Sequence, residues 1–297
     1  MAHYVGRIDD APIVEAWELA GAQTGLARQT LVGRAIGSVH TQIDIHHLAA
    51  GGEVRSHMHS FEAAHWVLEG EPAILLDGRA ARLKVGDYVL VPVGSSVAWA
   101  NPGSTPARWL SASSPIRLDP DAGRRDTFLL APETWDPTSA PPIGGGPIPR
   151  LMGNYVGTPP QAEALRLGEP ARGRKTAGRD TALVMYSGIS LKLMVDPTFG
   201  ADLLTMFTID YEAGGSAQIH DHPFEEAYVF MGGECEAEFE GTSYTLRTGD
   251  VAWAGVGALH GFFNDGPGRV RWLETQMPQP PRRNSYRWFD DWKRFEI

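Results

Sequence analysis

The chain has 297 residues, of which 42% are hydrophobic and 21% are charged, and its net charge is −10. This composition is typical of a globular protein with one large domain or two ordinary ones, and the acidic charge argues against nucleic acid as a partner. The single cysteine, Cys235, excludes an internal disulfide and a cysteine-based zinc site, and it predicts a reducing, cytoplasmic location.

Neither a signal peptide nor a membrane partner is expected. The first thirty residues carry several acidic side chains and no apolar run, and no stretch approaches eighteen apolar residues. The chain contains 34 glycines and 22 prolines, a high proportion that favours many turns between short strands.

The first half of the chain divides into three kinds of segment. Residues 10–20 are amphipathic, and we expect a short helix there. Residues 39–113 alternate short apolar segments with Gly, Pro and Asn turn signals, which predicts a β-barrel or sandwich. Residues 115–170 hold 11 of the 22 prolines and predict an ordered connector with a short helix near Pro160–Leu167.

The second half repeats the β pattern over residues 200–276. In the tail, Trp288, Trp292 and Phe295 lie at positions i, i+4 and i+7, which predicts a helix over 286–296 that docks through this face.

An internal repeat relates the two β regions. The segment SHMHSFEAAHWVLEGE from Ser56 matches IHDHPFEEAYVFMGGE from Ile219, and several matched pairs all lie 163 residues apart. These pairs are His57/His220, His59/His222, Gly70/Gly233, Gly86/Gly249, Gly94/Gly257 and Asn101/Asn264. A constant offset without a gap indicates that one β domain is present twice.

The second copy contains a set of residues that suits a metal ion. His220 and His222 alternate on a predicted strand, so both imidazoles point to the same side. Glu226 follows after a turn, and His260 lies further along the chain. Three neutral imidazoles and one carboxylate form a ligand set for a divalent transition metal, and Fe, Mn, Ni, Cu and Zn all remain open.

These residues, with the glycines around them, resemble the two motifs of the cupin superfamily. The motifs are met by Gly214, His220, His222, Glu226, Gly233, Gly249, Gly257, His260 and Asn264, and the one departure is Gly255 at a proline position. The resemblance implies an all-β fold of two antiparallel, jelly-roll β-barrels with few short helices in the connector and termini. We expect an N-terminal barrel over 1–120, a connector over 121–180, and a metal-binding C-terminal barrel with an aromatic tail over 181–297.

The first copy departs from the motif at two ligand positions. His57 and His59 remain, but Ala63 and Val97 stand where the second copy has its glutamate and third histidine. One interpretation is a degenerate barrel kept for structure, dimerisation or pocket shape; the alternative is a three-histidine site that adds His65. We therefore expect one metal per chain, and we expect the neighbouring Glu62 to face away from the barrel interior.

Four further residues are candidates for the substrate pocket. Tyr228 and Phe262 each lie two residues from a ligand, so they form either the pocket wall or ordinary barrel core. Phe224 lies in the turn between ligands and is a candidate rim or lid. Arg271 could meet a substrate carboxylate, although Arg108 matches it in the first copy and makes a structural role equally reasonable.

Three classes of function fit a metal in such a barrel. The first is an oxygen-dependent oxidoreductase similar to the bicupin dioxygenases, with O2 and a small oxygen-bearing organic molecule as partners, and with Glu226 as a catalytic proton acceptor. The second is a redox-neutral hydrolase, lyase or isomerase similar to ureidoglycine aminohydrolase. The third is a binding protein without catalysis. In each case we expect a homodimer, because such barrels commonly pair through edge strands.

Overall fold

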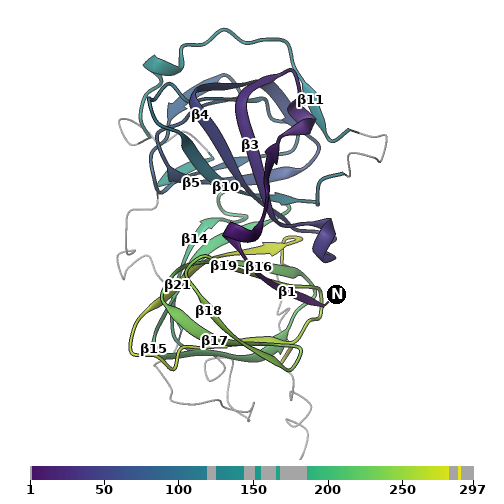
Figure 1. Cartoon of the computed structure of the whole chain (residues 1–297), viewed down its shortest axis with the longest axis vertical. Coiled ribbons are helices and arrows are strands. Elements are labelled where there is room, and N and C mark those ends of the chain that lie inside the picture. The colour runs from purple at the N-terminus through teal and green to yellow at the C-terminus, as the bar shows by residue number, and fades with distance from the viewer. Residues whose placement is uncertain are drawn as a thin grey trace, which may run out of the picture.

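The computed structural model describes residues 2–118, 125–143, 151–154, 165–167, 186–280 and 287–288. These residues form two curled antiparallel sheets, one above the other in Figure 1. Within these ranges all helical segments are single 3-10 turns, namely η1 (Ile8–Asp10), η2 (Trp17–Leu19), η3 (Arg34–Ile36) and η5 (Pro137–Ser139). The prediction of an all-β chain with two barrels is confirmed.

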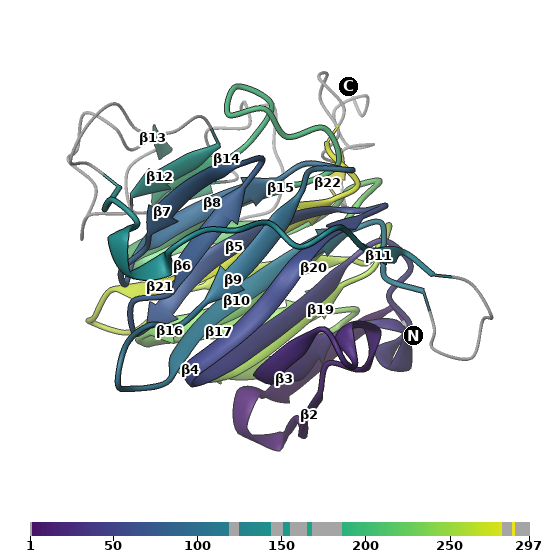
Figure 2. The ribbon, with the colours of Figure 1, turned by 90° about the horizontal axis from the view of Figure 1, so that it is seen from above.

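The first sheet has the strand order β12-β8-β5-β10-β4-β9-β6-β7, with β3 and β11 also paired to β4 and β2 paired to β3. Figure 2 shows β2 and β3 along its border. Its strands are β2 (Ile13–Glu15), β3 (Gln23–Val32), β4 (Gln42–His59), β5 (Glu62–Glu69), β6 (Ala73–Leu76), β7 (Arg79–Arg82), β8 (Asp87–Val91), β9 (Val97–Ala100), β10 (Ala107–Ser114), β11 (Thr127–Leu129) and β12 (Met152–Asn154).

The second sheet has the order β1-β19-β16-β21-β15-β20-β17-β18, with β14 and β22 also paired to β15 and β13 paired to β14. Its strands are β1 (His3–Arg7), β13 (Leu165–Leu167), β14 (Tyr186–Val195), β15 (Thr205–Asp221), β16 (Glu225–Gly232), β17 (Glu234–Phe239), β18 (Thr242–Arg247), β19 (Asp250–Ala254), β20 (His260–Phe263), β21 (Val270–Met277) and β22 (Arg287–Trp288).

The two sheets have the same strand order, and each strand of one has a counterpart in the other. Strands β5, β8, β9 and β10 become β16, β19, β20 and β21 when 163 is added to both of their bounds. The register agrees as well, because His57 pairs with Val97 across β4 and β9 as His220 pairs with His260 across β15 and β20. The duplication inferred from the offset is therefore present in the backbone.

Strand β1 belongs to the second sheet, although its residues were expected in the N-terminal barrel. Residues 3–7 fall within the segment expected for the N-terminal barrel, but they form β1 and pair with β19 of the second sheet. In Figure 1 this strand lies on the lower barrel next to the N label, and the chain then continues into the upper barrel. The equivalent place in the first sheet, beside β8, is taken by β12 from the expected connector. A strand therefore covers β8 and its counterpart β19 in the same way.

Within the described ranges, the expected short helices appear only as 3-10 turns such as η2, and the chain around them is extended. Within 10–20, Pro12 and the β-branched Ile13 and Val14 favour an extended chain, and β2 pairs there with β3. Leu165–Leu167 is strand β13, and residues 160–164 lie outside the described ranges. In the tail, Arg287–Trp288 forms the short strand β22, which pairs with Asp221 and His220 of β15; Trp292 and Phe295 lie outside the described ranges.

Three apolar cores follow from alternation along the strands. On β16, Tyr228 and Phe230 point into the C-terminal barrel, whereas Ala227 and Val229 point to the opposite face. That face packs against the matching face of the first sheet, so a core that includes Trp66 and Trp253 lies between the two barrels. The inside of the N-terminal barrel forms the third core. The two barrels thus share buried apolar surface.

A pair of buried glutamates ties each barrel to a loop of the other. The Glu225 carboxylate accepts hydrogen bonds from the backbone N–H groups of Val39, His40 and Thr41 at 2.9–3.2 Å, and from the Ser38 hydroxyl at 2.7 Å. Glu62, 163 residues earlier, accepts from the backbone N–H groups of residues 202–204 at 2.9–3.1 Å. The expectation that Glu62 faces away from the barrel interior is confirmed.

The motif glycines and asparagines shape the turns. Gly233 has φ +78°, and a Cβ there would lie 2.4 Å from the Arg269 carbonyl oxygen, so only glycine fits. The Asn264 side chain donates to the carbonyls of Tyr211, Glu212 and Gly268, and so holds two turns together.

In the described part of the chain, no helix is long and apolar enough to cross a membrane.

Candidate metal centre

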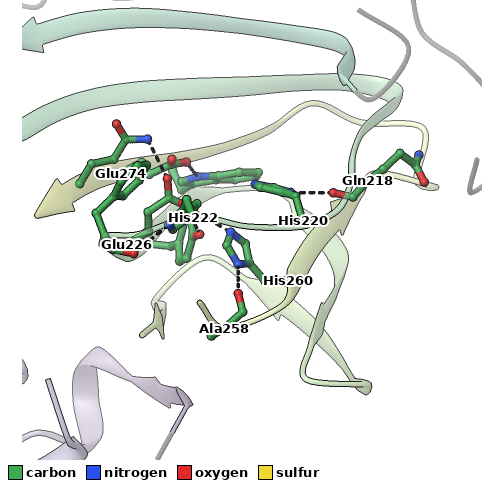
Figure 3. A network of polar contacts seen from close by, with 11 residues as sticks. Gln218, His220, His222, Glu226, Ala258, His260 and Glu274 are labelled. Carbon is green, nitrogen blue, oxygen red and sulfur yellow. Dashed lines mark hydrogen bonds and ion pairs between the residues drawn. The ribbon is translucent and has the colours of Figure 1, made fainter. Parts of the chain in front are cut away.

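The four predicted ligands meet inside the C-terminal barrel. His220 lies near the end of β15, Glu226 at the start of β16 and His260 at the start of β20, while His222 lies in the turn between β15 and β16. One ligand atom from each lies within 4.8 Å of those from the other three, and all four residues are buried. Figure 3 shows the imidazoles turned toward Glu226.

Backbone carbonyls orient all three histidines. The Nδ1 atoms of His220, His222 and His260 lie 2.6 Å, 2.8 Å and 2.8 Å from the carbonyl oxygens of Gln218, Phe224 and Ala258, respectively. A carbonyl only accepts, so each Nδ1 carries a proton, and Nε2 is the ring nitrogen left to bind a metal. This is the arrangement by which proteins present histidine to a metal.

The carboxylate of Glu226 completes the cluster and is itself held on both oxygens. Its Oε2 lies 2.9 Å from His222 Nε2 and 3.2 Å from His260 Nε2, and it accepts a hydrogen bond from the Tyr228 hydroxyl at 2.5 Å. Its Oε1 accepts from Gln276 Nε2 at 2.7 Å. Two ligand atoms bound at right angles to one ion at about 2.1 Å lie ~3 Å apart, so these separations fit a shared metal.

The electrostatics favour a charged carboxylate at Glu226 and a neutral imidazole at His220, whereas at His222 the Glu226 carboxylate outweighs burial and raises the pKa. Burial would raise the pKa of Glu226, but the adjacent His222 and His260 outweigh burial and hold this pKa well below its usual range. Burial, and then the neighbouring His260, lowers the pKa of His220 far below the ordinary histidine value. A deprotonated carboxylate and a neutral imidazole are the forms that bind a metal.

The cluster opens onto a cavity of about 170 Å³. His220, Glu226 and His260 form its polar end. Aromatic and aliphatic side chains form the remainder, namely Tyr186, Ile189, Leu191, Phe207, Ile209, Tyr211, Ala217, Tyr228 and Phe262, with Glu274 as a further acidic group. Tyr228 and Phe262 are therefore pocket wall.

Phe224 is neither rim nor lid. Its side chain is fully buried, and its ring stacks on the His222 imidazole with centroids 4.0 Å apart and planes within 6°. Because its carbonyl also holds His222 Nδ1, Phe224 fixes the orientation of a ligand and does not line the cavity. Phe61 stacks on His59 in the same way in the first barrel.

The candidate role of Arg271 in the pocket is wrong. Its neighbours Val270 and Trp272 point into the barrel, so alternation directs Arg271 outward. There its guanidinium binds both carboxylate oxygens of Asp210, at 2.8 Å and 3.0 Å. The equivalent Arg108 pairs with Glu69 at 2.6 Å, which supports the structural interpretation for both arginines.

Two residues of the site were missed by the sequence analysis. Gln276 and Glu274 lie on β21 directly opposite Glu226 and Tyr228 on β16. Burial, and then the nearby Glu226, raises the pKa of Glu274 well above the usual carboxyl range. The repeat contained the signal, since an acid and an amide stand here where the first copy has Ser111 and Ser113.

The first barrel offers no equivalent metal cluster in the part of the chain that the structure describes. His57 and His59 approach each other with ring centroids 4.8 Å apart, but Ala63 and Val97 are buried beside them without ligand atoms. His65 packs edge-on against Trp99. His57, His59 and His65 do not form a metal-binding cluster among the described residues, so the structure gives no support to the three-histidine site and favours the degenerate barrel.

Comparison with known proteins agrees with this geometry. A cupin domain model matches residues 44–113 and 207–275. The tetracenomycin polyketide synthase protein TcmJ of Streptomyces glaucescens is 29% identical over 125 residues, which covers 42% of this chain and 81% of TcmJ.

Solved structures share the whole architecture at low identity. Oxalate decarboxylase from Bacillus subtilis superposes with a TM-score of 0.62 at 12% identity, over 97% of this chain and 78% of that one. Salicylate 1,2-dioxygenase from Pseudoaminobacter salicylatoxidans gives 0.63 at 15%, over 93% and 81%. A putative glyoxylate-induced protein from Pseudomonas aeruginosa gives 0.63 at 16%, over 96% and 92%. With a cupin domain matched in each of its two barrels, the chain belongs to the cupin superfamily as a bicupin.

Proposed function

We propose that this bicupin is an oxidoreductase of the dioxygenase type that holds one divalent transition metal per chain and acts on a small, oxygen-bearing aromatic compound. The observation that carries the proposal is the cluster of His220, His222, Glu226 and His260, three of which form the polar end of a cavity lined mainly by aromatic and aliphatic side chains. A redox-active metal there would supply Lewis acidity toward a substrate oxygen and a common binding place for substrate and O2.

The size of the cavity supports a substrate with a single ring. An apolar cavity of about 150 Å³ accommodates benzene in another protein, so about 170 Å³ suits one ring with an oxygen substituent. Aromatic walls at Tyr211 and Phe262 would hold the ring by offset or edge-on stacking. The mostly apolar lining would also exclude water from the reacting atoms.

Glu226 has the position to accept a proton from the substrate. Its Oε2 faces the ligand cluster, and a substrate hydroxyl that enters the cluster would come within hydrogen-bond reach of this carboxylate. The Tyr228 hydroxyl and the Gln276 amide would keep the carboxylate in place while its charge changes.

A redox-neutral reaction is the second candidate, and Glu274 favours it. This carboxyl group lines the same cavity, and burial and the nearby Glu226 raise its pKa well above the usual carboxyl range, which favours its protonated form. A protonated Glu274 and an ionised Glu226 on neighbouring strands form an acid and a base, the pair that a lyase, isomerase or hydrolase needs.

Metal analysis combined with oxygen uptake tests the proposal. We expect one metal equivalent per chain in the purified protein, loss of that metal in His260→Ala, and full retention in the matched control His57→Ala from the other barrel. With a panel of phenols, catechols and hydroxybenzoates, we expect O2 consumption by the parent protein and the control, and none by His260→Ala.

Other outcomes assign the protein to a different class. Two tightly bound equivalents would contradict a single site. Substrate turnover that is unchanged under anaerobic conditions would exclude the dioxygenase and favour the redox-neutral reaction. Saturable binding of a phenol without any product would leave a binding protein.

A further inference from the structure

The interior of the N-terminal barrel lacks two carboxyl groups that the C-terminal barrel contains. Adding 163 relates Ala63 to Glu226 and Ser111 to Glu274. In the second barrel, the Trp272 indole N–H donates to Glu274 Oε2 at 2.9 Å. The first barrel keeps the equivalent Trp109, but the short Ser111 side chain cannot provide that acceptor.

Three buried side chains around this gap carry nitrogens without a hydrogen-bond partner among the residues that the structure describes. They are Trp109 at Nε1, His65 at Nδ1, and His46 at both ring nitrogens. Trp109 is 1% exposed and the two histidines are 6% exposed each. A buried donor without an acceptor is costly, so such a group normally indicates a bound polar molecule.

These three side chains line a single small cavity together with Arg117. The cavity measures about 20 Å³, somewhat more than the ~10–15 Å³ that one water needs. The Arg117 guanidinium is only 9% exposed and lies 5.0 Å from the Phe61 ring centroid and 3.7 Å from Asp44. It brings a positive charge to the cavity. Burial and then Arg117 lower the pKa of His46, and the same two causes lower the pKa of His65 to about 3, which favours the neutral form of both imidazoles.

We propose that the N-terminal barrel is a metal-free binding site for a small carboxylate of one or two carbons. The carboxylate would take the place of the two missing side-chain carboxyl groups, accepting from Trp109 Nε1 and His65 and facing the Arg117 guanidinium. This proposal is separate from the function of the C-terminal barrel, since none of its residues belongs to the metal cluster.

Ligand-observed saturation-transfer NMR on the full chain, with formate, acetate and propionate as probes, tests the proposal. For a ligand of three heavy atoms the tightest reasonable dissociation constant is about 1 mM, which this method detects. We expect saturable binding of formate and acetate and none of propionate, because the cavity is small. His260→Ala should bind formate as the parent does, which separates this site from any metal in the other barrel.

Two variants and a control locate the site. Ser111→Glu copies the second barrel and supplies the missing carboxylate from the chain itself, so we expect formate binding to be lost. Arg117→Gln should weaken binding about tenfold or more, as expected for loss of a charge-assisted contact. Arg108→Gln, on the outer face of the same barrel, should change nothing.

The proposal is overturned if formate and acetate show no saturable signal, which would mean that only water occupies the cavity. It is also overturned if binding disappears in His260→Ala, or if it persists unchanged in both Ser111→Glu and Arg117→Gln.

Discussion

Tyr228 and His65 occupy the same place in the two barrels and differ in what surrounds them. Tyr228 donates its hydroxyl to Glu226. His65 has Ala63 in place of that carboxylate, and it packs edge-on against Trp99 at 5.2 Å between ring centroids. Burial, and then Arg117 and His57, lowers the pKa of His65 to about 3. Without a carboxylate at position 63, the position equivalent to Tyr228 therefore holds a buried, neutral imidazole.

His65 should make the folded state sensitive to acid. The unfolded chain binds a proton at His65 below about pH 6.5, whereas the folded chain does not until about pH 3. The contribution of neutral His65 to the unfolding free energy is therefore fully present above about pH 6.5. It falls by about 1.4 kcal/mol per pH unit as the pH drops, or by roughly 2 kcal/mol down to pH 5. Urea denaturation of the parent protein and of His65→Gln in carboxylate-free buffers measures the difference.

His65→Gln cannot titrate, so its unfolding free energy should fall less between these two pH values, by about the same 2 kcal/mol. Parallel pH profiles for the two proteins would show that His65 is protonated in the folded state and would contradict the depressed pKa.

At the scale of the element, β16 contains two consecutive glutamates whose side chains point to opposite faces of the sheet. Glu226 faces the barrel interior and the metal ligands, whereas Glu225 faces outward and accepts the backbone N–H groups of residues 39–41. In β5 only the outward glutamate, Glu62, is kept. The duplicated strand therefore has the glutamate that joins the barrels in both copies, and the candidate metal ligand in only one of them.

Glu225→Gln should destabilise the protein by about 2–4 kcal/mol. The substitution removes the charge and places an NH2 group against N–H donors, and hydrogen bonds to a charged group are worth about 1.5–3 kcal/mol each. Urea denaturation gives the change in unfolding free energy, and Glu71→Gln, whose side chain is 66% exposed, is the control that should stay within about 0.5 kcal/mol. A Glu225→Gln protein as stable as this control would show that the loop contacts contribute little.

The sequence predicted those elements in which local chemistry and tertiary position agree. The offset of 163 identified equivalent strands, and the spacing of the histidines and Glu226 located the candidate metal cluster, because both depend on alternation along a strand. The segment 10–20 failed because an amphipathic pattern in a short stretch does not distinguish a helix from a strand that pairs with a neighbour. Arg271 failed because one residue of shift on a strand exchanges inside and outside.

At the scale of the whole molecule, the apolar core between the barrels couples their stabilities. Trp66 and Leu110 of the first sheet belong to the same buried cluster as Trp253 and Leu273 of the second. Unfolding either barrel alone would expose the other barrel's face of this core to water. The two barrels should therefore unfold together.

Metal removal should consequently lower the stability of both barrels at once. At a free metal concentration one hundred times the dissociation constant, binding contributes about 2.7 kcal/mol, which corresponds to roughly 4 °C for a chain of this length. We expect one calorimetric transition in the presence and absence of a chelator, with the Tm lowered by this amount. Two transitions, of which only one responds to the chelator, would show that the barrels are thermodynamically independent.

The placement of β1 also has a consequence for the order of events during synthesis. Residues 3–7 are made well before their partner β19, which begins at Asp250, some 240 residues later along the chain. At ~5–20 residues per second this delay is roughly 12–50 s. A nascent chain must therefore keep this segment unpaired while the first barrel emerges, and the segment can reach its place only once the second barrel has been made.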